Sequence, residues 1–172
     1  SITEKYTQIY NEDMLKLNLL APDVQPKATE YISEMIELIE ELKSKDFAYE
    51  KESHVLFHVP NYVNYGKLSK RNRDEQIAGS RVEIAPFKKD PADFVLWKPS
   101  DKSQPGWYSP WGVGRPGWHT ECSAMSKKTL GLPFDIHGGG RDLIFPHHEN
   151  EIAQSCCSSA NIEDSTSYAK YW

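Results

Sequence analysis

The sequence lacks the features that mark secreted and membrane proteins. It holds only three cysteines in 172 residues, so no disulfide framework is available, and we expect the adjacent Cys156 and Cys157 to pack within a helix. No apolar run approaches the ~18 residues of a membrane span, and no signal peptide opens the chain. These absences predict a soluble, cytoplasmic protein without membrane contact, built as one domain or one domain with a small insertion.

Excess positive charge is also missing. The formal net charge is −5 at pH 7, which argues against strong nucleic-acid binding by this stretch alone, because such binding depends on Lys and Arg neutralising phosphates. One basic cluster is present, and we interpret it as a solvated loop rather than an RNA contact. Its members are Lys67, Lys70, Arg71 and Arg73. An acidic helix face contains Glu30, Glu34, Glu37, Glu40 and Glu41.

Hydrophobic spacing in the first third of the chain predicts two helices and a hairpin. Apolar residues at helical spacing predict a first helix over 3–17. A second, amphipathic helix is expected from Pro26, a favourable first helical position, to about Lys45. Its buried stripe should contain Tyr31, Met35, Leu38, Ile39 and Leu42. Alternation over 47–59, interrupted by a polar turn, predicts a β-hairpin.

The rest of the chain predicts loops followed by helix, strand, turn and helix. Residues 67–89 are polar and are expected to form loop with one short helix, and 94–97 form a strand candidate. Residues 100–117 are rich in Pro, Gly and Ser, which predicts loop throughout. A helix over 119–130 should end at Gly131, and 134–137 should form a buried strand that runs into three glycines.

A set of potential metal ligands falls in this last third. Cys122, His147 and Glu151 offer a thiolate, an imidazole and a carboxylate, a combination that suits zinc and not calcium or magnesium. His147 and Glu151 are four residues apart, so on a helix they share one face. Cys122 alone is more simply a small buried hydrophobe. The complete set favours a metal site.

A zinc hydrolase that uses His147, Glu149 and Glu151 is the first alternative to consider. Residues 148–152 fail the His-Glu-x-x-His pattern, because Ile152 stands where the second histidine belongs.

The triple glycine at 138–140 lacks the dinucleotide and P-loop spacings, so from spacing alone it is equally a tight turn or a place where the backbone approaches a nucleotide.

Several segments carry a family resemblance. Residues 111–125 (WGVGRPGWHTECSAM) and 134–155 (FDIHGGGRDLIFPHHENEIAQS) closely resemble the cysteinyl-tRNA synthetases, a family of class I aminoacyl-tRNA synthetases. Upstream, 65–69 (YGKLS), 79–83 (GSRVE) and 93–98 (DFVLWK) also resemble that family. The resemblance therefore extends over nearly the whole chain, and the N-terminal helices share it more loosely.

The resemblance implies an α/β fold: part of a class I synthetase Rossmann-like domain with an inserted α+β connective-peptide subdomain. Residues 1–25 would link from the first half of the catalytic fold, 26–110 would form the insertion, and 111–172 the second half. The implied activity is ligation of cysteine to tRNA(Cys) with ATP, and Mg²⁺ would accompany the ATP. The alternative from a different class is a non-catalytic zinc or RNA-binding module.

The resemblance also implies roles for individual residues. Cys122, His147 and Glu151 match the family's zinc ligands, and the zinc would bind the substrate thiol rather than activate water. Substrate cysteine would lie against Trp118 and His137, and ATP or the adenylate against Gly138, Gly139 and Asp142. His148 has a less certain place, and His119 is expected to be structural. Arg141 departs from the small residue expected there.

Two class-defining motifs are absent from these 172 residues, one of the His-Ile-Gly-His type and one of the Lys-Met-Ser-Lys-Ser type. The similar-looking 125–128 (MSKK) lies in the Cys122 segment and is interpreted as a solvated helix face. The family also has a further zinc-binding cysteine upstream. We therefore expect a middle piece of the enzyme that lacks its N- and C-terminal parts, is inactive alone and binds zinc weakly.

Overall fold

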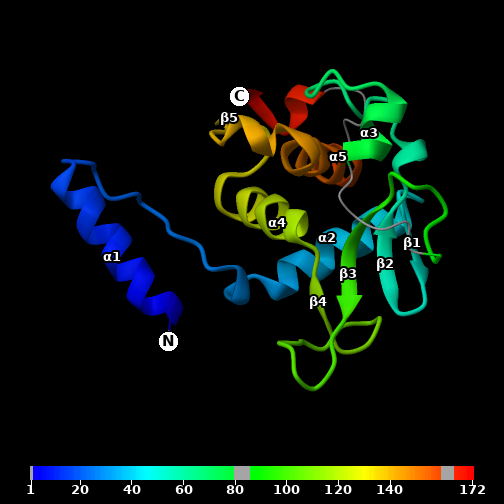
Figure 1. Ribbon diagram of the computed structural model, residues 1–172, viewed down its shortest axis with the longest axis horizontal. Helices are drawn as coiled ribbons and strands as arrows, with labels where there is room; N and C mark the ends of the chain where they lie inside the picture. The colour runs from blue at the N-terminus through cyan, green and yellow to red at the C-terminus, as the bar shows by residue number, and fades with distance from the viewer. Residues whose placement is uncertain (1, 80–85, 160–164) are drawn as a thin grey trace.

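The computed structural model describes residues 2–79, 86–159 and 165–172. Three helices, α2, α4 and α5, pack together beside a four-stranded antiparallel sheet, and a small parallel pair of strands lies near the C-terminus (Figure 1). This mixture of helix and sheet agrees with the predicted α/β class. Among the described residues, no helix combines the length and the apolar character needed to cross a bilayer.

The first helix, α1 (Ile2–Lys16), confirms the helix predicted over 3–17. It contains no buried residue, and Figure 1 shows it apart from the other elements, with an extended segment leading from it to α2. Its apolar side chains are therefore exposed, including Tyr6 at 62% and Leu15 at 65%. Burial against the rest of the described chain does not stabilise this helix.

The second helix, α2 (Ile32–Ser44), begins later than predicted. Pro26 precedes a separate short turn, η1 (Ala28–Glu30), and Tyr31 then leaves the helical region with φ −120° and ψ 22°. The predicted stripe is otherwise correct, because Met35, Leu38, Ile39 and Leu42 are at most 2% exposed. Burying side chains of this size contributes roughly 1.5–3 kcal/mol each. This face packs against α4 and α5.

The predicted hairpin is confirmed as β1 (Ala48–Lys51) and β2 (His54–Phe57). Glu52 and Ser53 join them, with φ of 51° and 59°. Positive φ at both central residues is the geometry of a type I′ turn, whose twist matches paired strands.

The short turn η2 (Val59–Asn61) follows, and α3 (Arg73–Gly79) is the predicted short helix within 67–89. Residues 80–83 of the family-like 79–83 stretch lie outside the described residues.

The sheet continues from β2 to β3 (Phe94–Pro99) and β4 (Gly114–Pro116). The prediction of loop throughout 100–117 was wrong at β4. At Gly114, a Cβ atom would lie 2.4 Å from Trp97 Nε1 and 2.5 Å from the Lys98 carbonyl oxygen. Glycine therefore acts here as a close-packing strand residue rather than as a sign of loop.

The C-terminal third begins with α4 (Trp118–Leu130), which ends at Gly131 with φ 75°. Strand β5 (Phe134–Ile136) pairs in parallel with β6 (Ala169–Tyr171). The prediction that this strand is buried was wrong beyond Phe134, since Ile136 is 72% exposed. In the described part of the chain β5 has β6 as its single neighbour, so one edge and much of its surface stay open.

The short turns η3 (Arg141–Leu143) and η4 (Ile144–His148) lead into α5 (Glu149–Ser158), and η5 (Ser165–Ser167) precedes β6. Every residue of α5 is buried, including Cys156 and Cys157, which confirms their predicted packing role. One hydrophobic core joins α2, the four-stranded sheet, α4 and α5. Its largest fully buried side chains include Trp97, Tyr168, Phe57, Met35 and Leu38.

Salt bridges also connect two of these helices. On α4, Lys127 contacts Glu41 of α2 at 2.5 Å, and Lys128 contacts Glu34 at 3.3 Å. The lysines expected to form a solvated face are thus partly exposed partners of the acidic face of α2. Exposed pairs of this kind contribute little, typically below ~1 kcal/mol.

Candidate metal and substrate site

The site forms where the first turns of α4 and α5 meet. Gly117 brings α4 against the sheet, because a Cβ at this position would lie 2.0 Å from the Val95 carbonyl oxygen. Trp118 and Cys122 follow on the first turns of α4. His147 lies two residues before α5, after a kink at Phe145, whose φ of −136° and ψ of 130° are extended. Two segments far apart in sequence therefore present their polar side chains to one another.

The three predicted metal ligands come together. One ligand atom from each of Cys122, His147 and Glu151 lies within 4.8 Å of the other two. His147 is 5% exposed and Glu151 is fully buried. Thiol, imidazole and carboxylate donors at this spacing have the chemistry of a zinc site. The structure thus gives the sequence-based hypothesis a matching geometry.

The carboxylate of Glu151 supplies a test of this fit. Its Oε1 atom lies 2.6 Å from His147 Nε2. In the described part of the chain Oε1 makes this close contact and is a buried atom that has no hydrogen bond of standard geometry. A buried carboxylate oxygen without a partner is costly. The two atoms fit better as a pair that converges on a cation beside Cys122.

His147 is oriented by a second histidine. Its Nδ1 atom lies 2.8 Å from Nδ1 of His119, so a hydrogen bond joins these two nitrogens and leaves Nε2 facing Glu151. Burial lowers the pKa of His119 to about 3, and nearby His147 acts in the same direction. His119 is therefore neutral near pH 7. An outer partner on one imidazole nitrogen is the usual way to fix the other toward a metal.

Burial has opposite outcomes for the two acidic ligands. It raises the pKa of the Cys122 thiol to about 12, and the nearby Glu151 and Glu121 add to the effect. Burial also opposes ionisation of Glu151, but contacts with His137, His147 and Tyr168 outweigh it and lower that pKa to about 2. Without a cation the site therefore holds a neutral thiol and a charged carboxylate. A bound cation favours the thiolate.

The two predicted substrate residues lie on this site. Trp118 is 58% exposed, and its ring centroid lies 4.3 Å from that of His147. It therefore presents an aromatic surface to solvent directly beside a candidate ligand. His137 Nε2 lies 2.7 Å from Oε2 of Glu151 and donates to this charged carboxylate. His137, His148 and Glu151 form a second group whose ligand atoms lie within 4.8 Å of one another.

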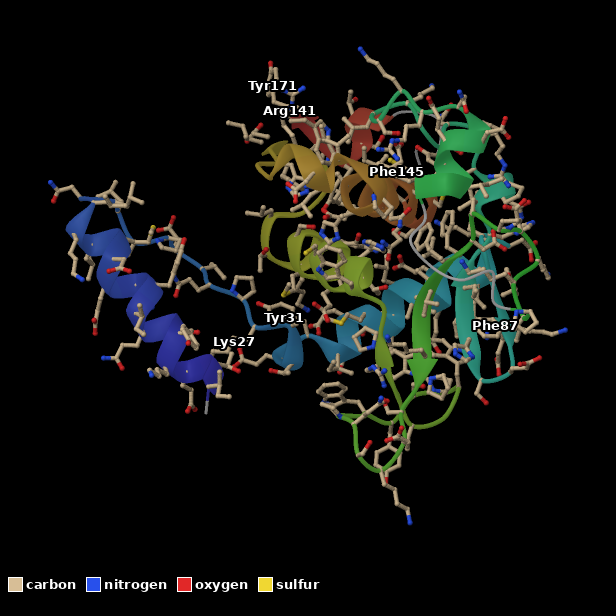
Figure 2. All side chains as sticks on the ribbon, viewed as in Figure 1. Lys27, Tyr31, Phe87, Arg141, Phe145 and Tyr171 are labelled. Carbon is tan, nitrogen blue, oxygen red and sulfur yellow. The ribbon has the colours of Figure 1, made fainter. Side chains whose placement is uncertain are left out.

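The predicted nucleotide residues lie at the exposed edge that follows β5. A Cβ on Gly139 would lie 2.5 Å from His148 Nε2, so only glycine allows this close approach. Gly138 faces open space, with no atom within 4 Å of its Cβ position. Asp142 is exposed on η3. Arg141 beside it is also exposed, and Figure 2 shows its side chain projecting outward from the edge of the fold.

Glu149, one of the residues of the hydrolase alternative, has a different role in the structure. It is fully buried, and its Oε2 accepts the backbone N–H of Ser69 at 2.8 Å. It thereby holds the family-like 65–69 segment against α5.

In the neighbouring basic cluster, Arg73 pairs with Asp90, and the guanidinium of Arg71 lies 4.7 Å from the centre of the Phe145 ring. Two of the four basic residues therefore have intramolecular partners.

One residue of the site was missed by sequence reasoning. Tyr168 is fully buried, and its hydroxyl donates to Glu151 Oε2 at 2.6 Å. No metal-ligand or catalytic pattern includes it, and it lies 17 residues after the glutamate that it contacts. A tyrosine in a strand-like stretch near the C-terminus indicates packing, so the sequence carried no signal for this contact.

The chain belongs to the catalytic domains of class I tRNA synthetases. The family model described as tRNA synthetases class I (C) catalytic domain matches residues 1–172. Among similar proteins are the cysteine–tRNA ligases of Parvibaculum lavamentivorans, 63% identical over 171 residues, and Rhodospirillum rubrum, 62% identical over 172. Each match covers 99% of this chain. The ligase of Paramagnetospirillum magneticum is 59% identical over 172 residues, or 100% of the chain. The chain spans 36% of the length of each.

Proposed function

We propose that this chain is part of a cysteine–tRNA ligase, which activates cysteine with ATP and transfers the cysteinyl group to tRNA(Cys). One observation carries the proposal beyond similarity to ligases of that name. The ligand atoms of Cys122, His147 and Glu151 lie within 4.8 Å of one another, and the exposed ring of Trp118 lies 4.3 Å from the ring of His147. A soft metal site at a substrate-accessible surface is what recognition of a thiol requires.

Cys122, His147 and Glu151 would hold the zinc ion. When bound, zinc would supply a soft Lewis acid that accepts the substrate thiolate and binds a neutral hydroxyl poorly. By resemblance to the family, a cysteine from another part of the enzyme completes the protein ligands. His119 keeps His147 in the orientation in which Nε2 is available.

Selection of cysteine over serine gives this arrangement its purpose. The two amino acids differ by sulfur for oxygen, and pocket shape alone separates such near-isosteres by only about 10²-fold. A thiol, with a reference pKa of about 8.5, loses its proton far more readily than a hydroxyl. Trp118 would cover the substrate side chain and exclude water, and His137 would border the same pocket.

ATP and the adenylate would lie along the exposed turn after β5. Gly138 leaves open space beside the backbone, and Asp142 offers a carboxylate at the same edge. Gly139 allows the turn to pass against His148, beside the group that contains Glu151. The nucleotide and the thiol pocket would then adjoin, as in-line attack requires, with Mg²⁺ accompanying the triphosphate.

A non-catalytic zinc or RNA-binding module is the alternative function. A structural zinc site is closed, with four protein ligands, whereas the first group in the described residues has three, and one of them, His147, contacts the exposed Trp118. The net charge of −5 and the internally paired arginines do not favour an RNA-binding surface.

The test of the proposed activity is amino-acid-dependent exchange between ATP and pyrophosphate by the complete protein. We expect exchange with cysteine and not with the other standard amino acids, followed by aminoacylation of tRNA(Cys). Exchange that prefers another amino acid, or none with a folded, zinc-loaded protein, would contradict the proposal. The 172-residue chain alone is expected to show no exchange, because neither class-defining nucleotide motif is among its residues.

A further inference from the structure

The two carboxylate oxygens of Glu151 have different surroundings. Oε1 contacts His147 Nε2 and has no hydrogen-bond partner among the described residues. Oε2 has two partners, His137 Nε2 at 2.7 Å and the Tyr168 hydroxyl at 2.6 Å. A freely rotating carboxylate would present either oxygen, or both, to a cation. Here one oxygen is fixed and the other is left available.

Tyr168 is placed to impose this difference. It lies immediately before β6 and is fully buried. Its ring packs edge-on against Phe134 and His137, with centroids 4.9 and 5.6 Å away. Its hydroxyl also lies 3.1 Å from Ser126 Oγ, one turn beyond Cys122 on α4. The tyrosine therefore links β6 to both ligand-bearing helices through a ring that has little room to move.

We propose that Tyr168 is a positioning residue of the zinc site, which together with His137 fixes Oε2 of Glu151 so that Oε1 alone faces the metal. This inference rests on the proposed zinc site. Hydrogen bonds to the non-ligating atoms of a ligand reduce the freedom lost when metal binds and favour single-oxygen coordination. Loss of such an outer partner typically weakens metal binding about 10- to 100-fold.

The second group of ligand atoms offers a competing explanation. His137, His148 and Glu151 also lie within mutual reach, so a metal there would use Oε2. Oε2, however, already accepts two hydrogen bonds, whereas Oε1 has none. We therefore place the metal on the Cys122 side, next to the oxygen that has no hydrogen bond. The hydrogen-bonded oxygen, Oε2, holds the carboxylate in place.

The experiment compares the complete ligase with its Tyr168→Phe variant, which loses the hydroxyl but retains the ring. Zinc affinity is measured by competition with a chromogenic chelator, and cobalt(II) is substituted to record the visible ligand-field spectrum. We expect about 10- to 100-fold weaker zinc binding. The cobalt bands should also lose intensity, because the freed Oε2 can join the coordination sphere and raise the coordination number.

Two controls separate this role from general packing. Tyr62→Phe removes the hydroxyl of another buried tyrosine of the same core and should change neither zinc affinity nor the cobalt spectrum. Ser126→Ala removes the second contact of the Tyr168 hydroxyl and should leave the bond to Glu151 in place. Should Tyr168→Phe fail to fold, His137→Leu removes the other donor to Oε2 and should weaken zinc in the same direction.

The outcomes distinguish the inference from the proposed function. A wild-type ligase that binds no zinc would overturn the proposed site itself. One zinc per wild-type protein, with unchanged affinity and cobalt spectrum in folded Tyr168→Phe, would leave the site standing and overturn the positioning role. A second zinc that is lost in His148→Ala would also overturn it, because Oε2 would then be a ligand.

Discussion

At the scale of single residues, Glu151 combines full burial with a negative charge, two properties that are ordinarily costly to combine. Its carboxylate is fully buried yet charged near pH 7, because contacts with His137, His147 and Tyr168 outweigh the cost of burial and lower the pKa to about 2. A buried charge with one unsatisfied oxygen is a poor element of a hydrophobic core. The same carboxylate is a good ligand for a cation held beside Cys122 and His147.

The first prediction concerns this carboxylate. Replacing Glu151 by Gln should reduce zinc affinity by more than the roughly 10- to 100-fold that follows loss of an outer partner, since a charged ligand is itself removed. The measurement is chelator competition with the complete protein. Glu121→Gln is the matched control, because Glu121 is a neighbouring, partly buried carboxylate on α4 outside the ligand group. Equal zinc affinity in the two variants would contradict the assignment.

The second prediction concerns pH and Cys122. Burial raises the pKa of its thiol to about 12, so at pH 7 to 9 the metal-free site carries a proton that zinc must displace. Zinc affinity should therefore rise with pH across this range, by up to about tenfold per unit for one released proton. Titrations at several pH values measure the slope. A pH-independent affinity, or an equal slope in Cys122→Ala, would count against a thiolate ligand.

At the scale of elements, sequence patterns predicted the helices and strands that are specified by residues within the element itself. The helix α4, the hairpin β1–β2 and the buried stripe of α2 followed from periodicity and turn residues. Strand β4 did not follow from such patterns, because Gly114 is required there by its close contact with Trp97 on the neighbouring strand. The exposure of β5 was missed for a similar reason, since burial of a strand depends on neighbours that periodicity does not identify.

The third prediction belongs to β4. Gly114→Ala should destabilise the fold by about 1–3 kcal/mol, the usual cost of overpacking, because the added methyl group meets the Trp97 ring and the Lys98 backbone. Urea denaturation of the 172-residue chain measures the change. Gly138→Ala is the control, since its Cβ faces open space, and should cost far less. Equal midpoints for the two variants would show that β4 is not closely packed.

At the scale of the whole molecule, the sequence predicted which three potential metal ligands would lie together. Cys122, His147 and Glu151 form a chemically specific set, and the structure brings their ligand atoms within 4.8 Å. His119 was predicted to be structural, but its contact with His147 was not, and Tyr168 was not predicted at all, because histidine and tyrosine serve many packing roles and their partners here are distant in sequence. Division of the chain at residues 25 and 110 also remains a prediction, although one core joins segments on both sides of 110.

Cys122, His147 and Glu151 are proposed to hold a zinc ion that selects cysteine by its thiol. The most direct test measures cysteine and serine activation by the complete protein as isolated, after verified zinc removal, and after zinc is restored. We predict that preference for cysteine far exceeds ~10²-fold with zinc, falls to that level or below without it, and returns on restoration. Unchanged discrimination in the zinc-free protein would contradict selection of cysteine by zinc.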